Sequence, residues 1–117
     1  MKKTIQVTAF GRVRTLVAQT AEYGNGRLAI TLGEPIDPNS EDYAFYPEGI
    51  EPFGVLTVNL AAPCPEKHAY IKTWSENEGW AEEAARALGG KPTRYAFPTG
   101  YVTAPLWDFS ALFEQEN

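Results

Sequence analysis

The sequence predicts an α+β fold: a single domain over residues 1–117, with a curved, mostly antiparallel sheet of about six strands and one helix packed on it. Apolar and polar residues alternate in several short runs, turn sequences typical of hairpins join many of these runs, and only one run has helical periodicity. A chain of 117 residues with 44% hydrophobic residues is long enough to bury one core.

The first predicted strands lie before residue 33. Residues 4–10 alternate between apolar and polar side chains, which is typical of a strand with one buried face. Residues 12–23 and 27–32 flank the sequence Gly-Asn-Gly at 24–26. Glycine and asparagine tolerate the positive φ angles of a tight turn, so these two runs are predicted to form a hairpin.

A proline-rich, acidic segment follows this hairpin. Residues 33–52 contain four prolines and no hydrophobic periodicity, which predicts an irregular excursion over the surface, fastened by Tyr43, Phe45 and Tyr46. The segment has six acidic residues and no basic one, whereas residues 1–27 have five basic residues and one acidic residue. Such segregation can steer a charged partner, although a merely solvated loop is the alternative. The predicted acidic interaction loop contains Glu41, Asp42, Glu48 and Glu51.

Two further strands are predicted at residues 53–60 and 68–74. The loop between them, residues 62–67, has prolines on both sides of Cys64, and these remove the backbone donors that a strand would use. In both strands one face is aliphatic. The opposite face of residues 68–74 mixes aromatic and polar side chains.

The single predicted helix follows Trp74. Ser75 and Glu78 have the spacing of a capping box, in which a hydroxyl and a carboxylate bond to the free N–H groups of a helix start, and Asn77 is a competing cap. Gly89 and Gly90 end the helical pattern. The apolar stripe that would pack on the sheet contains Trp80, Ala84, Ala87 and Leu88.

A last hairpin is predicted from residues 93–97 and 100–109, which alternate on either side of Pro98. The C-terminal residues Leu112 and Phe113 are expected to pack against the domain.

Few residues suited to catalysis occur in the chain. Cys64 and His68 are the single cysteine and the single histidine, and they could act as nucleophile and base only if the thiol had a low pKa. Structural zinc sites use four Cys or His ligands, and no phosphate-binding glycine motif is present. We therefore expect no enzyme activity, no metal and no cofactor.

Charge and hydropathy also restrict the function classes. A net charge of −5 disfavours direct binding to nucleic acid, because the phosphates would have to be offset by basic residues. The chain has no apolar run of the ~20 residues that span a bilayer and no signal-peptide pattern at its start, so we expect a cytoplasmic protein.

Strand alternation places several bulky side chains where polar residues are expected. One interpretation is that the helix, through Trp80, covers these rings as a second core. The other is a patch that binds a ligand or a partner, because Trp, Tyr and Arg are frequent at binding hot spots. The candidate residues are Tyr70, Trp74, Asn77, Trp80, Arg94, Tyr101 and Trp107.

Three segments carry a resemblance to a known family. The strand LTVNL at 56–60, the run WAEEAARALGGKPT at 80–93 and the aromatic ending at 95–101 resemble a small uncharacterised bacterial domain-of-unknown-function family. The likeness spans about residues 53–109, with Gly79 where such proteins often have a proline. It implies an association with conjugative elements and phages of anaerobic gut bacteria, and it implies no catalytic residues.

Three hypotheses follow. The first is a non-enzymatic accessory or counter-defence protein of a mobile genetic element, which binds and blocks a host protein through the acidic loop and neighbouring rings. The alternative is a protein that sequesters a small nucleotide-like ligand, with the base stacked between Trp74, Trp80 and Tyr101 and a phosphate on Arg94. A further alternative is a structural domain of unknown function.

Overall fold

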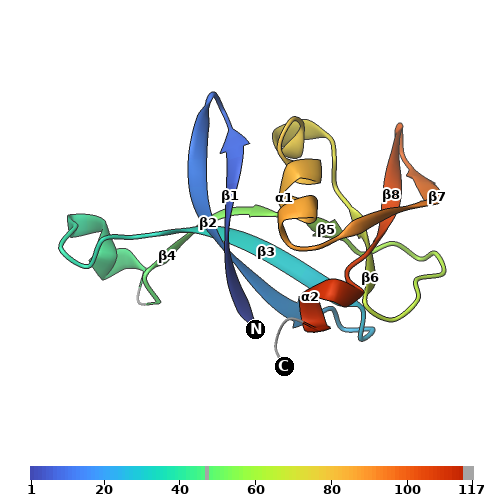
Figure 1. Ribbon diagram of the computed structural model, residues 1–117, viewed down its shortest axis with the longest axis horizontal. Coiled ribbons are helices and arrows are strands. Elements are labelled where there is room, and N and C mark those ends of the chain that lie inside the picture. The colour runs from blue at the N-terminus through green and yellow to red at the C-terminus, as the bar shows by residue number, and fades with distance from the viewer. Residues whose placement is uncertain (47, 115–117) are drawn as a thin grey trace.

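Two four-stranded antiparallel sheets form the framework of the protein (Figure 1). The structure is a computed structural model and describes residues 1–46 and 48–114. Within these residues the α+β class is confirmed, but the single curved sheet of about six strands is wrong, because eight strands are divided between two sheets. The first sheet has the order β1 (Lys2–Ala9), β2 (Arg12–Glu22), β3 (Leu28–Pro35), β4 (Ile50–Val55). The second has the order β5 (Thr57–Val58), β6 (His68–Ile71), β8 (Val102–Asp108), β7 (Lys91–Thr99).

Tight turns with left-handed backbone connect β1 to β2 and β2 to β3. The predicted hairpin around residues 24–26 is confirmed, since β2 and β3 pair antiparallel and Gly26 has a φ of 82°. A two-residue turn joins β1 to β2, in which Phe10 and Gly11 have φ angles of 54° and 82°. Two consecutive positive φ angles match the twist of a hairpin. The turn leaves the Phe10 ring 67% exposed.

The predicted strand 53–60 is interrupted at Leu56, where the chain passes from the first sheet to the second. The N–H of Leu56 donates to the carbonyl of Ile30 (2.9 Å), and its carbonyl accepts from the N–H of Lys72 (2.8 Å). Leu56 is completely buried. Thr57 is also buried, and its hydroxyl accepts from the N–H of Ile30 at 3.1 Å. Leu56 and Thr57 therefore join the two sheets.

The main core lies between the first sheet, one face of the second sheet and the helix α1 (Ala81–Ala87). Ala81, Ala84 and Ala85 are buried, and these small side chains allow the helix to approach β1 closely. A second helix, α2 (Ser110–Glu114), adds Leu112 to this core, so the prediction of one helix was incomplete. Among residues 1–46 and 48–114, no helix has the length and hydropathy needed to cross a membrane.

The predicted capping box is wrong. Ser75–Asn77 form a 3-10 turn, η2, in which Ser75 has a φ of 59°. Glu78 is extended and Gly79 has a φ of 92°, so the backbone leaves the helical conformation at both residues. The cap residue of α1 is instead Trp80, which makes no side-chain capping hydrogen bond.

A smaller apolar cluster lies on the other face of the second sheet. The predicted alternation of β6 is confirmed, because Ala69 and Ile71 belong to the main core and Tyr70 belongs to the smaller cluster. The Tyr70 hydroxyl donates to the carbonyl of Pro63 at 2.7 Å and so ties the 62–67 loop to this face. The cluster consists of Ala62, Tyr70, Ala104 and Leu106, with Val58, Leu60, Cys64 and Trp74 packed against it.

The last predicted hairpin is confirmed and is longer than expected. β7 continues through Pro98, and the chain turns at Gly100, which has a φ of 63°. Pro98 is tolerated because β7 is an edge strand, where a missing N–H need not break the ladder. Pro105 lies in β8 at the point where pairing with β6 stops.

Candidate interaction surface

The predicted set of rings does not form one surface, because its members point to both faces of the second sheet. In the register between β6 and β8, Trp107 stands opposite Ala69 and Tyr70 stands opposite Leu106. Neighbouring residues of a strand point to opposite faces, so Tyr70 and Trp107 face different clusters. Tyr70 is 5% exposed and Trp107 is 2% exposed. The interpretation of these two rings as core residues is the one that their burial supports.

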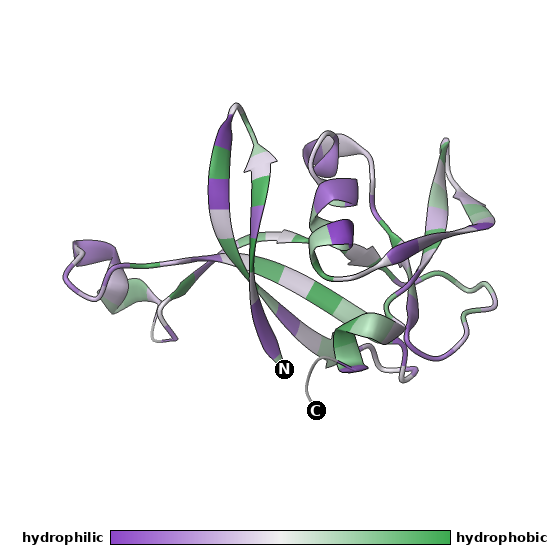
Figure 2. Ribbon diagram, viewed as in Figure 1, coloured by the Kyte–Doolittle hydropathy of each residue, from purple (hydrophilic) through white to green (hydrophobic). Residues whose placement is uncertain are grey.

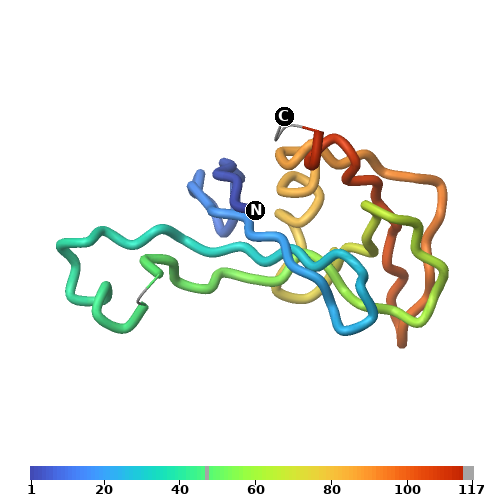
Figure 3. The backbone as a smooth tube through the Cα atoms, turned by 90° about the horizontal axis from the view of Figure 1, so that it is seen from below, coloured from blue at the N-terminus to red at the C-terminus, as the bar shows by residue number. Residues whose placement is uncertain are grey.

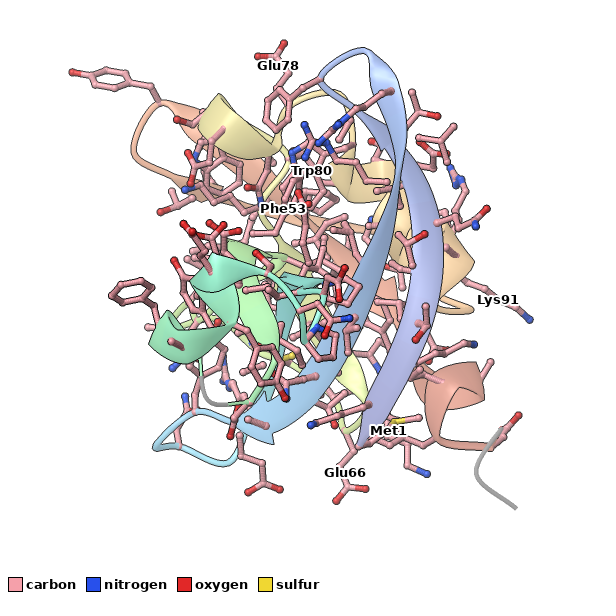
Figure 4. The ribbon with its side chains drawn as sticks, turned by 90° about the vertical axis from the view of Figure 1, so that its left-hand side faces the viewer. Met1, Phe53, Glu66, Glu78, Trp80 and Lys91 are labelled. Atoms are coloured by element: carbon pink, nitrogen blue, oxygen red, sulfur yellow. The ribbon has the colours of Figure 1, made fainter. Side chains whose placement is uncertain are left out.

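Trp80 and Asn77 are buried at the junction of the two sheets. The Trp80 indole N–H donates to the carbonyl of Glu76 at 2.8 Å, and its ring packs edge-on against Phe53 with the centroids 5.1 Å apart (Figure 4). Asn77 is 0% exposed, and its amide group donates to two backbone carbonyls, one in β4 and one just beyond β6. Both side chains stabilise the fold and neither lies at the surface.

Trp74, Arg94 and Tyr101 occupy three separate environments. Trp74 packs against the smaller cluster and is partly buried. The Arg94 guanidinium lies 5.1 Å from the centroid of the Tyr95 ring and donates to its hydroxyl at 3.0 Å. Tyr101 stands in solvent at the end of the β7–β8 hairpin. Because Trp80 lies in the main core, these rings do not surround a common space for a stacked base.

The segment expected to be an irregular excursion is instead an arm that projects from the first sheet (Figures 1 and 3). β3 and β4 extend outward into it, and beyond them the N–H of Ile36 donates to the carbonyl of Gly49 at 2.8 Å. The arm carries the 3-10 helix η1 (Glu41–Phe45) near its end. We call residues 33–46 and 48–52 the acidic arm.

Local interactions order the backbone at the tip of the acidic arm. The Ser40 hydroxyl accepts from the N–H of Asp42 at 3.2 Å and caps η1. Gly49 has a φ of 74°, and a Cβ atom there would lie 3.2 Å from the Tyr43 ring. The turn therefore depends on glycine both for its backbone angle and for the space that the ring occupies.

The side chains of this tip face solvent. Figure 2 shows the end of the arm as mostly hydrophilic. Phe45 is 77% exposed, so the expectation that it fastens the segment is wrong. A large ring exposed among carboxylates is the kind of side chain that anchors a protein partner. All four acidic residues predicted for this surface are exposed: Glu41, Asp42, Glu48 and Glu51.

Arg14 holds the base of the acidic arm. Its guanidinium lies beside the rings of Phe10 and Phe53, 5.5 Å and 5.4 Å from their centroids, which are 6.0 Å from each other, and it bonds to the carboxylate of Glu34. Glu34 stands opposite Glu51 in the register of β3 and β4. The positive charge of Arg14 therefore reduces the repulsion between two facing carboxylates.

A groove with a volume of about 640 Å³ lies between the β2–β3 hairpin and the loop that contains Cys64. The Cys64 thiol donates to the backbone carbonyl of His68 at 3.3 Å, while the His68 Nδ1 atom is 2.8 Å from the carbonyl of Glu66. Burial raises the pKa of the Cys64 thiol, and the charge of Arg27 opposes this effect. The imidazole is thus bonded to the backbone instead of the thiol, and the arrangement does not favour a thiolate.

Sequence reasoning missed the two residues that define the arm most clearly. The sequence predicts that Phe45 fastens the segment, whereas its position between acidic residues is the available signal for exposure. Arg14 lies at a polar position of a predicted strand. Nothing in the sequence linked it to Glu34, because their contact depends on the pairing of β2 with β3.

Comparison with family models, with curated proteins and with solved structures finds no match to this chain. The class of protein is therefore defined by its own fold and surface. It is a small α+β domain of two antiparallel sheets that presents an ordered acidic arm.

Proposed function

We propose that this chain is a non-enzymatic accessory protein that binds and blocks a partner protein through its acidic arm. The observation that carries the proposal is the projection of an internally hydrogen-bonded arm whose tip exposes carboxylates around Phe45. In the mobile-element context that the family resemblance implies, the partner would be a host protein and the role would be counter-defence.

The chemistry of the tip defines the partner surface. It would be basic, to complement the arm charges, and it would contain an apolar pocket for Phe45, which can lose most of its exposed area on binding. Because the arm backbone is already ordered by its own hydrogen bonds, little conformational entropy would be lost when it docks. This geometry supports partner binding better than the nucleotide alternative, whose rings are not brought together.

The test is capture of a partner from host lysate by the tagged protein. Reversing Glu41, Asp42, Glu48 and Glu51 to lysine should abolish capture, because the four reversed charges then repel the basic surface of the partner. The matched control reverses four exposed carboxylates elsewhere and has the same net charge: Glu66, Glu78, Glu82 and Glu114.

A Phe45→Ser variant separates the two contributions of the arm. Loss of the ring should mainly speed dissociation of the captured partner, whereas loss of the charges should mainly slow association and reduce its salt dependence. If the arm-reversed protein and its charge-matched control captured the same proteins equally well, the arm would not be the binding surface.

A further inference from the structure

A second exposed surface lies on the β7–β8 hairpin. Tyr95, Phe97 and Tyr101 are 56%, 39% and 108% exposed, which is unusual for large rings on one hairpin of a folded domain. β7 is an edge strand, and most of its residues are exposed. We call the exposed and partly exposed residues of Lys91–Asp108 the aromatic hairpin.

The aromatic hairpin has a net positive charge, opposite in sign to that of the acidic arm. It carries two exposed basic residues, Lys91 and Arg94, and one acidic residue, Asp108, which stands opposite Lys91 in the register of β7 and β8. Figure 4 shows Lys91 pointing away from the body of the protein. Residues 36–52 contain five acidic residues and no basic residue. One surface is thus aromatic and basic, and the other is aromatic and acidic.

These two surfaces cannot meet within one molecule. They lie at opposite ends of the long axis, along which the protein extends 44 Å (Figures 1 and 3). Pairing between β3 and β4 and the contact of Arg14 with Glu34 fix the direction of the arm, so it does not fold back. In a second copy of the chain the same complementary surface is available.

We propose that the aromatic hairpin docks the acidic arm of a second copy, in a head-to-tail contact. Glu41 and Asp42 would meet Lys91 and Arg94, and Phe45 would pack on the exposed rings of the hairpin. The contact joins different surfaces of the two copies, so one copy keeps a free arm and the other keeps a free hairpin, and longer chains can form.

The contact is weak and depends on protein concentration. A hairpin and an arm tip present a small area compared with the roughly 800 Å² per partner of a standard interface. The net charge of −5 on each copy also repels the other at low ionic strength. Association through this contact would occupy the arm and so compete with the host protein of the proposed function.

The experiment is sedimentation velocity on the purified full chain over a range of concentrations. The hairpin-reversed variant carries Lys91→Glu and Arg94→Glu, and the arm-reversed variant carries Glu41→Lys and Asp42→Lys. Each variant alone should associate roughly tenfold more weakly than the natural sequence, because the side chains at positions 41 and 42 and those at positions 91 and 94 then have charges of the same sign. Mixed in equal amounts, the two variants should associate again, since the charges at positions 41 and 42 of each variant are opposite to those at positions 91 and 94 of the other.

A Lys2→Glu, Arg12→Glu variant is the control, because it makes the same charge change at two exposed positions of the first sheet, and it should associate like the natural sequence. The proposal is overturned if the natural sequence stays monomeric at every concentration, if the hairpin-reversed variant associates unchanged, or if the mixture fails to associate. Capture of a host protein is a separate readout. The hairpin-reversed variant should retain it, so failure of this inference is distinguishable from failure of the proposed function.

Discussion

Asn77 is a buried polar residue whose removal should measure the strength of the junction between the two sheets. Its amide nitrogen donates to the carbonyl of Val55 at 2.8 Å and to that of Lys72 at 3.0 Å, while its Oδ1 atom has no hydrogen-bond partner. An Asn77→Ala variant loses both bonds and leaves two part-buried carbonyls to find water. At ~1 kcal/mol for each bond plus a small cavity term, we expect a loss of about 2–3 kcal/mol in the free energy of unfolding.

An Asn77→Asp variant sharpens this prediction, because it keeps the shape of the side chain and replaces the donor with a carboxylate that faces two carbonyls. Burial next to acceptors raises the pKa of such an acid in the folded state above its unfolded value. The loss in its free energy of unfolding, relative to the natural sequence, should therefore grow as the pH rises above ~4, because the introduced carboxyl group ionises readily in the unfolded chain above that pH. Above that pH the variant should be less stable than the alanine variant.

Urea unfolding followed by tryptophan fluorescence at pH 4 and pH 7 provides the measurement. Exposed Asn59, which accepts a hydrogen bond from Asn25 at 3.2 Å, gives the matched control, and its Ala and Asp variants should stay within about 0.5 kcal/mol of the natural sequence. A cost for Asn77→Ala no larger than that for Asn59→Ala would refute the role of Asn77 in joining the sheets. An aspartate variant that is insensitive to pH would refute the electrostatic part of the reasoning.

Two further predictions concern ionisable groups. The pKa of Asp108 lies below its usual 3.8, mainly because the Ser110 hydroxyl donates a hydrogen bond to the carboxylate and secondly because the Ser110 N–H does so. The ionised carboxylate therefore stabilises the fold above pH 3.8, and this contribution is lost as the pH falls through the folded-state pKa. Asp108→Asn keeps an oxygen that can cap Ser110, and it should remove the acid-dependent loss of stability. Asp108→Ala should lower the free energy of unfolding by ~1 kcal/mol at pH 7. Urea unfolding between pH 2 and pH 7 distinguishes the two variants. Burial raises the pKa of the Cys64 thiol, so its reaction with a disulfide reagent at pH 7 should be slower than that of the same thiol in urea. A faster reaction in the folded protein would contradict the conclusion that the fold does not favour a Cys64 thiolate.

Local elements could be predicted from the sequence wherever a strand or a turn depends on neighbouring residues. The hairpin around residues 24–26 is an example, because glycine and asparagine determine the turn and alternation determines the strands. The division at Leu56 could not be predicted, since the run from 53 to 60 is uniformly suited to a strand. Its interruption depends on hydrogen bonds to Ile30 and Lys72, which are distant in sequence.

The candidate site shows the same limit. Alternation correctly placed Tyr70 on one face of β6 and Ala69 with Ile71 on the other. It could not predict which residues of β8 share a sheet face with Tyr70. A shift of one residue in the register would have placed Tyr70 and Trp107 on one face, as the sequence hypothesis requires. The acidic charges of the arm were predictable, because charged residues in a proline-rich segment are solvated whatever its conformation. The strand pairing that turns this segment into an arm was not.

The positions of charge and apolar area on the arm imply different tasks for them in binding. Exposed carboxylates act over about a Debye length, ~8 Å at physiological ionic strength, so they govern the rate and direction of approach. They remain solvated in the free protein, and the desolvation cost offsets much of their attraction on contact. Phe45 acts only on contact, and its burial is favourable without such a cost. An arm that exposes both kinds of side chain on an ordered backbone is suited to finding a basic partner quickly and to retaining it through one ring.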